Sequence, residues 1–318
     1  MNGKIILSIS ISFFLVFGSL FYIYFDSIQS EEEINQYQDF SQSLNETSKK
    51  LFLFGSSHVG GLNSSLIVDS VHEKNNNYDF FNLATNGDTP NRRISDISYI
   101  ATLNPEIIFY GVSYRDFNSL VPITSEYILP DIKLLFRQSV PEYLESLNPQ
   151  LISRSIIKDT LANYGILDVS EYNIHPVNTP FFSLGDSQTI ILEERVLERS
   201  ILTIIPLPQT LEISASNNEQ VDSLKKIIEE LQVNGIEVVI FTTPIHDFYL
   251  DEIPIETKLI FEQILYDISN EYDIKIYDFT DKYSGLEIWN NLDHIAYNEN
   301  SNIFTEDVAE MILKELDE

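Results

Sequence analysis

A serine at the end of an apolar run is the residue of this chain best suited to nucleophilic chemistry. Residues 51–54 are apolar, and Gly55, Ser56 and Ser57 follow them as a turn of small residues. A strand-to-helix turn projects a hydroxyl from the carboxyl edge of a sheet, and the free N–H groups at a helix start can hold a developing oxyanion. We therefore predict Ser57 as a nucleophile whose own backbone N–H contributes to an oxyanion hole.

A serine nucleophile needs a base within hydrogen-bond reach, and the chain offers five histidines. His294 is the best placed, because it lies in a polar segment just before the last predicted helix, beside Asp293 and three residues after Asn291. His58 is its main competitor, since it follows Ser57 directly, but a side chain entering the next helix would point away from that hydroxyl. Outside the role of base, we expect His58 to contact substrate.

Two further polar turns follow predicted strands. Asn82 lies near the end of the strand predicted at 78–83 and is expected to contact substrate, and Gly87 in the following loop could present its N–H to a substrate oxygen. The alternative for Gly87 is an ordinary loop in which it makes the turn and Pro90 opens the next helix.

The other turn carries a hydroxyl and a guanidinium. Ser113 could donate a hydrogen bond to an oxyanion, and Arg115 could anchor an anionic or sugar substrate. The alternative for Arg115 is a surface ion pair with Asp116 or another neighbour.

Together these segments resemble the SGNH hydrolases, also called GDSL-like esterases and lipases, in both order and spacing. The resemblance covers residues 51–318 and implies that Ser57 is the nucleophile, Gly87 an oxyanion donor and His294 the base. It is strongest to membrane-anchored members that serve the acylation and deacylation of surface polymers. The resemblance implies a flavodoxin-like fold with no cofactor.

Two positions depart from the family pattern. Ser113 stands where the family has asparagine, and its shorter side chain predicts a weaker oxyanion hole or one completed by Arg115. Asn291 stands where the family has the aspartate three residues before histidine, and an amide cannot stabilise imidazolium as a carboxylate does. Asp293 could replace that carboxylate; a Ser–His dyad, a distant carboxylate and an inactive site are the alternatives.

A second Gly-Asp-Ser sequence ends at Ser187. It follows no predicted strand, precedes no helical pattern and comes too late in the chain, so we do not predict Ser187 as the nucleophile. It lies in an insertion over residues 118–215, which is rich in Leu, Ile and Pro and has a helical pattern at 141–161. The insertion is expected to form a lid or a subdomain that binds a partner.

The alternation of apolar runs with amphipathic segments predicts how these side chains are positioned. Strands are predicted at 51–54, 78–83, 106–110, 236–241 and 273–277. Helices are predicted at 90–103, 217–233, 255–272 and 306–316. This order predicts a three-layer α/β/α domain with a mainly parallel five-stranded sheet, in which ligands bind beyond the carboxyl ends of the strands.

The amino-terminal segment predicts a membrane anchor. Residues 5–25 carry no charge and are long enough as a helix to cross a bilayer core, with aromatic residues at the end. Lys4 precedes the apolar run and acidic residues follow it, so residues 1–26 are predicted as a cytoplasmic terminus and transmembrane helix. Residues 27–50 are predicted as a polar, acidic tether, which places the main domain outside the cytoplasm. Cleavage as a signal peptide is the alternative.

Composition restricts the partners. Asp and Glu outnumber Lys and Arg by 49 to 19 among 318 residues, and a formal charge of -30 disfavours nucleic acid as a partner. The chain has no cysteine, and its histidines show no HxH or HExxH spacing, so no metal site is predicted. We expect a membrane-tethered, extracytoplasmic esterase or O-acyltransferase for acylated glycans or small esters; the alternative is an inactive relative that binds an envelope partner protein.

Overall fold

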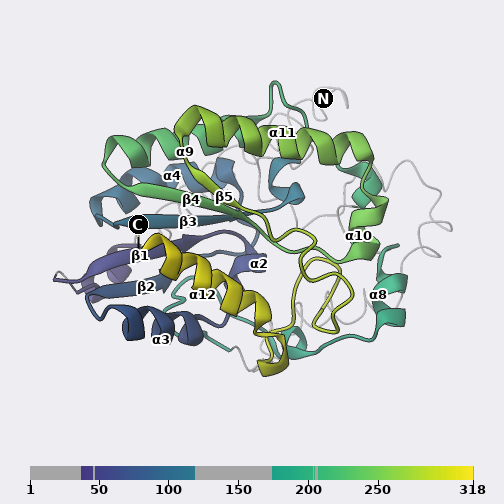
Figure 1. The fold of residues 1–318 in the computed structure, drawn as a ribbon, viewed down its shortest axis with the longest axis horizontal. Coiled ribbons are helices and arrows are strands. Elements are labelled where there is room, and N and C mark those ends of the chain that lie inside the picture. The colour runs from purple at the N-terminus through teal and green to yellow at the C-terminus, as the bar shows by residue number, and fades with distance from the viewer. Residues whose placement is uncertain (1–36, 46, 119–173, 203, 205–206, 318) are drawn as a thin grey trace, which may run out of the picture.

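A five-stranded parallel sheet forms the centre of the protein in a computed structural model, which describes residues 37–45, 47–118, 174–202, 204 and 207–317 (Figure 1). The strands are ordered β2-β1-β3-β4-β5. Their bounds are Lys49–Phe54 (β1), Tyr78–Asn82 (β2), Ile107–Val112 (β3), Glu237–Thr242 (β4) and Lys275–Tyr277 (β5). The prediction of an α/β fold with a five-stranded parallel sheet is therefore confirmed. Because the strand order reverses between β1 and β3, a ligand site is expected at their carboxyl ends.

Helices cover both faces of the sheet (Figure 1). One group consists of α4 (Pro90–Thr102), α9 (Glu219–Val233) and α11 (Ile255–Tyr272), in which α9 packs against both of the others. The other group consists of α3 (Ser64–Lys74) and α12 (Ile303–Glu315), which pack against each other. Right-handed crossovers between parallel strands place these two groups on opposite faces.

The central strands are apolar because both of their faces are covered. Phe52, Leu53, Ile108 and Phe109 are fully buried, and they belong to continuous apolar runs rather than to an alternating pattern. The strands differ from their predicted ranges by at most two residues at either end; β1 begins two residues earlier, β3 ends two residues later and β5 begins two residues later. Asp273 adopts a left-handed conformation (φ 53°) that ends α11, so β5 begins two residues later than predicted.

Short elements connect the main ones. They are α2 (Ser57–Gly60), α8 (Glu194–Ser200), α10 (Asp247–Glu252) and the 3₁₀ turns η1 (Tyr114–Phe117), η2 (Asp186–Thr189), η3 (Pro208–Thr210) and η4 (Glu299–Ser301). The described part of the predicted insertion packs on the domain, where Phe182 is buried with its ring against Gly60. The helical pattern at 141–161 lies outside the described residues.

The amino-terminal part of the described chain is docked on the domain. Residues 37–43 are helical, and Tyr37 and Phe40 are buried in the core, whereas the sequence predicted an unpacked tether over 27–50. The Tyr37 hydroxyl accepts a hydrogen bond of 2.5 Å from Arg93, whose buried guanidinium also pairs with Asp88. The predicted anchor at 5–25 lies outside the described residues, and within the described ones no helix has the length and apolar character to span a membrane.

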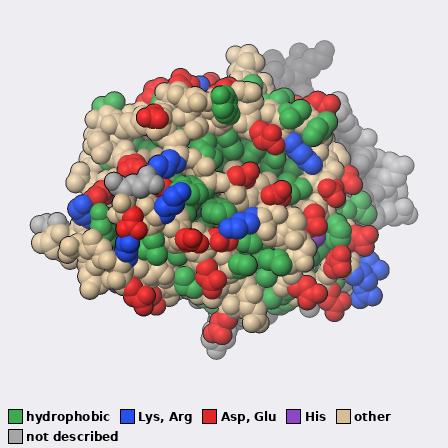
Figure 2. All heavy atoms as spheres, viewed as in Figure 1, with side chains coloured by type: hydrophobic (Ala, Val, Ile, Leu, Met, Phe, Trp, Pro, Cys, Tyr) green, Lys and Arg blue, Asp and Glu red, His purple; other side chains and the backbone are tan. Residues whose placement is uncertain are grey.

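Carboxylates are spread over the surface. In the view of Figure 2, acidic side chains are scattered across the face, and Lys and Arg side chains are fewer. The distribution follows the excess of Asp and Glu in the sequence.

Candidate active site

The turn between β1 and α2 depends on Gly55. Its φ of +148° is rarely available to residues with a side chain, and a Cβ there would lie 2.5 Å from Val59 Cγ2 and 3.0 Å from the Gly111 carbonyl oxygen. Gly111 on β3 is equally crowded, since its Cβ would also lie 2.5 Å from Val59 Cγ2. The two glycines let α2 sit directly against the ends of β1 and β3, which places Ser57 at the first residue of α2.

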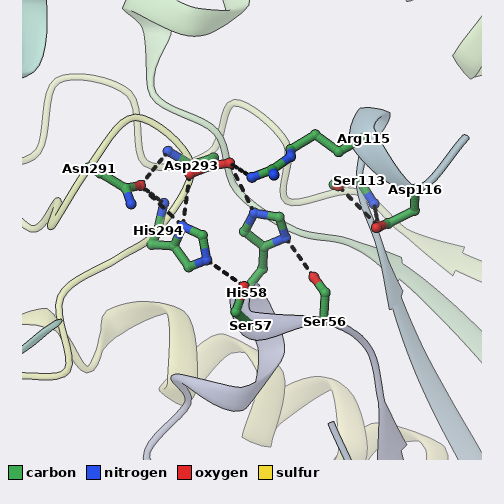
Figure 3. A network of polar contacts seen from close by, with 9 residues as sticks. All are labelled: Ser56, Ser57, His58, Ser113, Arg115, Asp116, Asn291, Asp293 and His294. Atoms are coloured by element: carbon green, nitrogen blue, oxygen red, sulfur yellow. Dashed lines mark hydrogen bonds and ion pairs between the residues drawn. The ribbon is translucent and has the colours of Figure 1, made fainter. Parts of the chain in front are cut away.

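The structure brings Ser57 and His294 together across 237 residues of sequence. Ser57 Oγ lies 2.7 Å from His294 Nε2 (Figure 3). The other ring nitrogen, Nδ1, lies 2.8 Å from Asp293 Oδ1, and an ionised carboxylate can only accept a hydrogen bond. His294 therefore carries its proton on Nδ1, and its Nε2 accepts the hydrogen bond of the Ser57 hydroxyl. This is the arrangement that a general base needs.

Asp293 occupies the place opposite Nδ1 because of the turn that Asn291 stabilises. Asn291 Oδ1 accepts hydrogen bonds from the backbone N–H groups of Asp293 (2.9 Å) and His294 (2.7 Å). The same oxygen lies 3.1 Å from His294 Nδ1, which is longer than the contact to Asp293. A bridge between Trp289 and Ile295 closes the loop. Asn291 thus shapes the loop, and Asp293 supplies the charge.

The Asp293 carboxylate is buried but remains ionised. Arg115 donates to its Oδ2, and His58 Nε2 lies 3.3 Å from the same oxygen. Burial alone would raise the pKa of Asp293, but His294, His58 and Arg115 outweigh it and hold the pKa well below the usual range. The site therefore keeps a carboxylate that can stabilise an imidazolium at His294.

His58 points away from Ser57, as expected from its position in the helix. Its Nδ1 lies 2.9 Å from the hydroxyl of Ser56, and its ring centroid is 4.3 Å from that of His294. Burial and, to a lesser extent, the neighbouring His294 lower the pKa of His58 to about 4, against the opposing effect of Asp293. His58 is therefore neutral at physiological pH, and the geometry assigns the role of base to His294.

The polar side chains of the turn after β3 bind other residues of the protein. Ser113 donates to Asp116 Oδ2 through both its backbone N–H (2.6 Å) and its hydroxyl (3.0 Å). Burial raises the pKa of Asp116 to about 7, although these two hydrogen bonds oppose the shift. Arg115 pairs with Asp293, not with Asp116. The Ser113 hydroxyl is thus committed to Asp116 instead of an oxyanion, which corrects the predicted role.

Asn82 and Gly87 were also predicted at the site, but neither makes a hydrogen bond to Ser57 within the described chain. Asn82 is fully buried, where its side chain donates to the Val59 carbonyl and accepts from the Ala84 N–H. Gly87 lies in an exposed turn with φ +63°, and its carbonyl accepts a hydrogen bond from Arg92. Asn82 is therefore a structural residue that ties β2 to α2. Among the predicted oxyanion donors, the backbone N–H groups of Ser57 and Gly87 make no hydrogen bond to described residues, and of these two residues only Ser57 lines the cavity described next.

A cavity of about 240 Å³ opens beside the nucleophile. Ser57, His58 and His294 line it, whereas Gly87, Ser113 and Arg115 do not. The remaining lining combines apolar side chains with amides and hydroxyls: Leu62, Leu184, Ile295, Ala296, Phe304, Asn63, Gln188, Asn290, Tyr297, Asn298, Asn302, Ser301 and Thr305, together with Gly61 and Glu299. An uncharged small group fits such a space better than an ionic one.

The second Gly-Asp-Ser sequence lies beside this cavity, between two residues that line it. It lies in η2, where the carbonyl of Ser187 accepts a hydrogen bond of 2.7 Å from Asn290, in the loop that carries His294. Leu184 and Gln188 on either side line the cavity, but Ser187 does not. Sequence analysis did not identify Leu184 and Gln188, because only the fold brings the end of the insertion next to the histidine loop.

The grouping of His58, Asp293 and His294 has to be considered as a metal site, because one donor atom from each lies within 4.8 Å of the others. His294 Nδ1 and Asp293 Oδ1 are already bonded to each other, and the Arg115 guanidinium on Oδ2 would repel a cation. The arrangement fits proton transfer better than metal binding.

Comparisons with known proteins assign no family. No family model and no curated protein matches the chain. One similar solved structure is described as the crystal structure of TesA, with a TM-score of 0.35 and 8% sequence identity over 72% of this chain and 77% of that one. At such a TM-score the likeness carries no argument, and the interpretation of the site rests on its own geometry.

Proposed function

We propose that this protein is a serine ester hydrolase or O-acyltransferase of the SGNH type. The observation that carries the proposal is the chain of contacts from Ser57 through His294 to Asp293, next to a cavity that the nucleophile lines. Such a chain activates a hydroxyl towards a carbonyl carbon. It has no other evident purpose in the fold, since both serine and histidine lie at the surface of the cavity rather than in the core.

In the first half of the reaction, Ser57 Oγ attacks the ester carbonyl and transfers its proton to His294 Nε2. The carboxylate of Asp293 stabilises the resulting imidazolium through Nδ1–H. The carbonyl oxygen becomes an oxyanion, which the free N–H of Ser57 can bind. The tetrahedral intermediate then expels the alcohol, which takes the proton from His294 Nε2, and leaves an acyl-serine.

In the second half, water or an acceptor hydroxyl attacks the acyl-serine. His294 Nε2 accepts the proton of the attacking group and returns it to Ser57 Oγ when the acyl bond breaks. Attack by water gives hydrolysis, and attack by a sugar or another alcohol gives acyl transfer. The same residues serve both outcomes, because the two reactions differ only in which hydroxyl enters the cavity.

The cavity supports a substrate class of small acyl groups on uncharged, hydroxyl-rich molecules. Its apolar part, with Leu62, Leu184 and Phe304, suits a short acyl chain, and its amides suit the hydroxyls of a glycan or a small alcohol. The apolar sequence at 5–25 and the acidic residues after it support a membrane-tethered domain outside the cytoplasm. We therefore propose acylated surface glycans or small esters as substrates.

A non-catalytic role in the cell envelope is the second candidate. It is favoured by the incomplete oxyanion hole, because the Ser113 hydroxyl is bonded to Asp116 and Gly87 does not line the cavity. In that case the cavity binds a partner or polymer without turnover.

Labelling with a fluorophosphonate probe distinguishes the two. The full chain, in mild detergent, is compared with the Ser57→Ala, His294→Ala and Ser187→Ala variants. Labelling that Ser57→Ala and His294→Ala abolish and Ser187→Ala preserves would establish an activated serine. Absence of labelling in folded native protein would instead favour the binding role.

A further inference from the structure

Asp293 is the junction of two serine–histidine arms. One arm runs from Ser57 through His294 to Oδ1, and the other runs from Ser56 through His58 towards Oδ2 (Figure 3). The first arm carries the proposed chemistry. The second has no role in the reaction steps above, although its residues are almost fully buried beside the site.

The protonation of His58 follows from its two neighbours. Asp293 Oδ2 is an acceptor, so the proton of the neutral ring belongs on Nε2, which faces that oxygen at 3.3 Å. The Ser56 hydroxyl then donates to Nδ1 at 2.9 Å and fixes this tautomer. The Nε2 atom is buried, and it makes no hydrogen bond of regular geometry with a described residue. Hydrogen bonds of this kind are often long in an unliganded site and shorten when substrate binds.

Asp293 needs such support because of where it stands in the sequence. It directly precedes His294, so its carboxylate has to turn back towards the ring of its own neighbour to reach Nδ1. Donors on Oδ2 fix the second oxygen and thereby the plane of the carboxylate. Arg115 supplies one donor from the turn after β3, and His58 is positioned to supply the other from α2.

We propose that His58 is a positioning residue, which donates from Nε2 to Asp293 and holds that carboxylate in line with His294, so that Asp293 can act where position 291 lacks a charge. The inference rests on the proposed function. It differs from the substrate contact predicted for His58, because both ring nitrogens face protein groups rather than the cavity.

Substitution of His58 by Gln or by Asn distinguishes its contact with Asp293 from its contact with Ser56. In His58→Gln the amide nitrogen can reach the position of Nε2 and keep the donor to Asp293. In His58→Asn the shorter amide can reach only the position of Nδ1, near Ser56. The rate constant of fluorophosphonate labelling is measured for both in the full chain, with His72→Gln as a control at a partly exposed histidine of α3.

We expect His58→Asn to slow labelling by about 10²-fold, the effect of a small misplacement in an active site, and His58→Gln to retain most of the rate. The low-field ¹H NMR signal of His294 Nδ1–H, bonded to Asp293, should persist in native protein and His58→Gln and disappear in His58→Asn. The low-field signal separates this effect from a loss of packing, because the signal reports the bond between Asp293 and His294 directly, whereas the one methylene group by which Gln and Asn differ changes packing.

Equal rates and an unchanged low-field signal in the two variants would overturn the proposal for His58. Equal losses in both variants would also overturn it, since the loss would then not depend on the donor. Failure of the proposed function has a different signature, in which the native protein itself does not label.

Discussion

Arg115, which is partly exposed, forms an ion pair with the buried Asp293, between segments 178 residues apart in the sequence. Arg115 belongs to the turn after β3, and Asp293 to the loop before α12. The pair therefore ties the carboxyl end of the sheet to the loop that carries the proposed base. From the sequence, this guanidinium was predicted either to anchor substrate or to form an ion pair with Asp116 or another neighbour; in the structure it pairs with Asp293.

Replacement of Asp293 tests its role as the third member of the triad. We expect Asp293→Asn to lower the turnover of an acetyl ester by about 10⁴-fold, because the amide cannot stabilise the imidazolium of His294. Adding Asn291→Asp should restore part of this loss, since Asn291 Oδ1 already lies 3.1 Å from Nδ1. Esterase kinetics on the single and double variants would measure both effects. Full activity in Asp293→Asn would show that His294 works without a carboxylate.

Replacement of Arg115 should change the pH dependence of the reaction. Arg115 helps to hold the pKa of the buried Asp293 well below the usual range, so Arg115→Gln should raise that pKa. Activity requires the ionised carboxylate, so the rate should be lost at a higher pH in the variant than in native protein as the pH falls. The measurement is kcat/KM across pH 4 to 8, with the exposed Arg195→Gln as control. If Arg115→Gln lowered kcat/KM by the same factor at every pH, this explanation would be contradicted, and a contact between Arg115 and substrate would be favoured.

Asp116 should make the stability of the fold dependent on pH. Its pKa is raised from 3.8 to about 7 by burial, so the folded state binds more protons than the unfolded state between these values. Stability from this group is therefore present at low pH and lost as the pH rises towards and through 7, by an amount on the order of a few kcal/mol. In Asp116→Asn this contribution should be absent, while the acceptor for Ser113 remains.

Urea unfolding of native protein and Asp116→Asn from pH 4 to 8 measures the difference. The variant should gain stability relative to native protein as the pH rises. A constant difference across the range would refute a raised pKa, and the exposed Asp251→Asn serves as the control.

Gly55 should tolerate no side chain. Gly55→Ala combines an unfavourable φ of +148° with a Cβ placed 2.5 Å from Val59, so we expect a loss of about 2 to 5 kcal/mol in the free energy of unfolding. Gly235→Ala is the matched control, because its φ of +76° is also positive but a Cβ there meets nothing within 4 Å. It should cost only about 1 kcal/mol. Similar costs at the two positions would mean that crowding around α2 is unimportant.

The sheet and the main helices could be predicted because their signals are local. A continuous apolar run such as 107–110 predicts a buried parallel strand, and the amphipathic pattern at 255–272 matches the bounds of α11. The pairing of Ser57 with His294 was predicted on other grounds, since Ser57 follows a strand, His294 lies in a polar segment just before the last helix, and this order resembles the SGNH pattern.

The rest of the site depends on contacts that no local pattern shows. Whether Asp293 could turn back to His294 was decided by the backbone of the loop, through the amide of Asn291. Ser113 was predicted to donate to an oxyanion because it lies in a polar turn directly after a strand. In the structure its hydroxyl donates instead to Asp116, three residues later. Docking of residues 37–43 was not predicted, because two buried aromatic side chains in a polar segment give too weak a periodic signal.

If the proposed membrane anchor at 5–25 exists, the docked helix at 37–43 limits the distance between the candidate active site and the bilayer. If the anchor ends at Phe25, residues 26–36 are all that separate it from the folded domain, and even a fully extended chain of that length spans no more than about 40 Å. Release of the helix at 37–43 would lengthen this connection, but it would break the buried hydrogen bond between Tyr37 and Arg93 and would therefore be costly. A polymer modified by the proposed enzyme would then have to lie close to the membrane surface, within the reach of these residues.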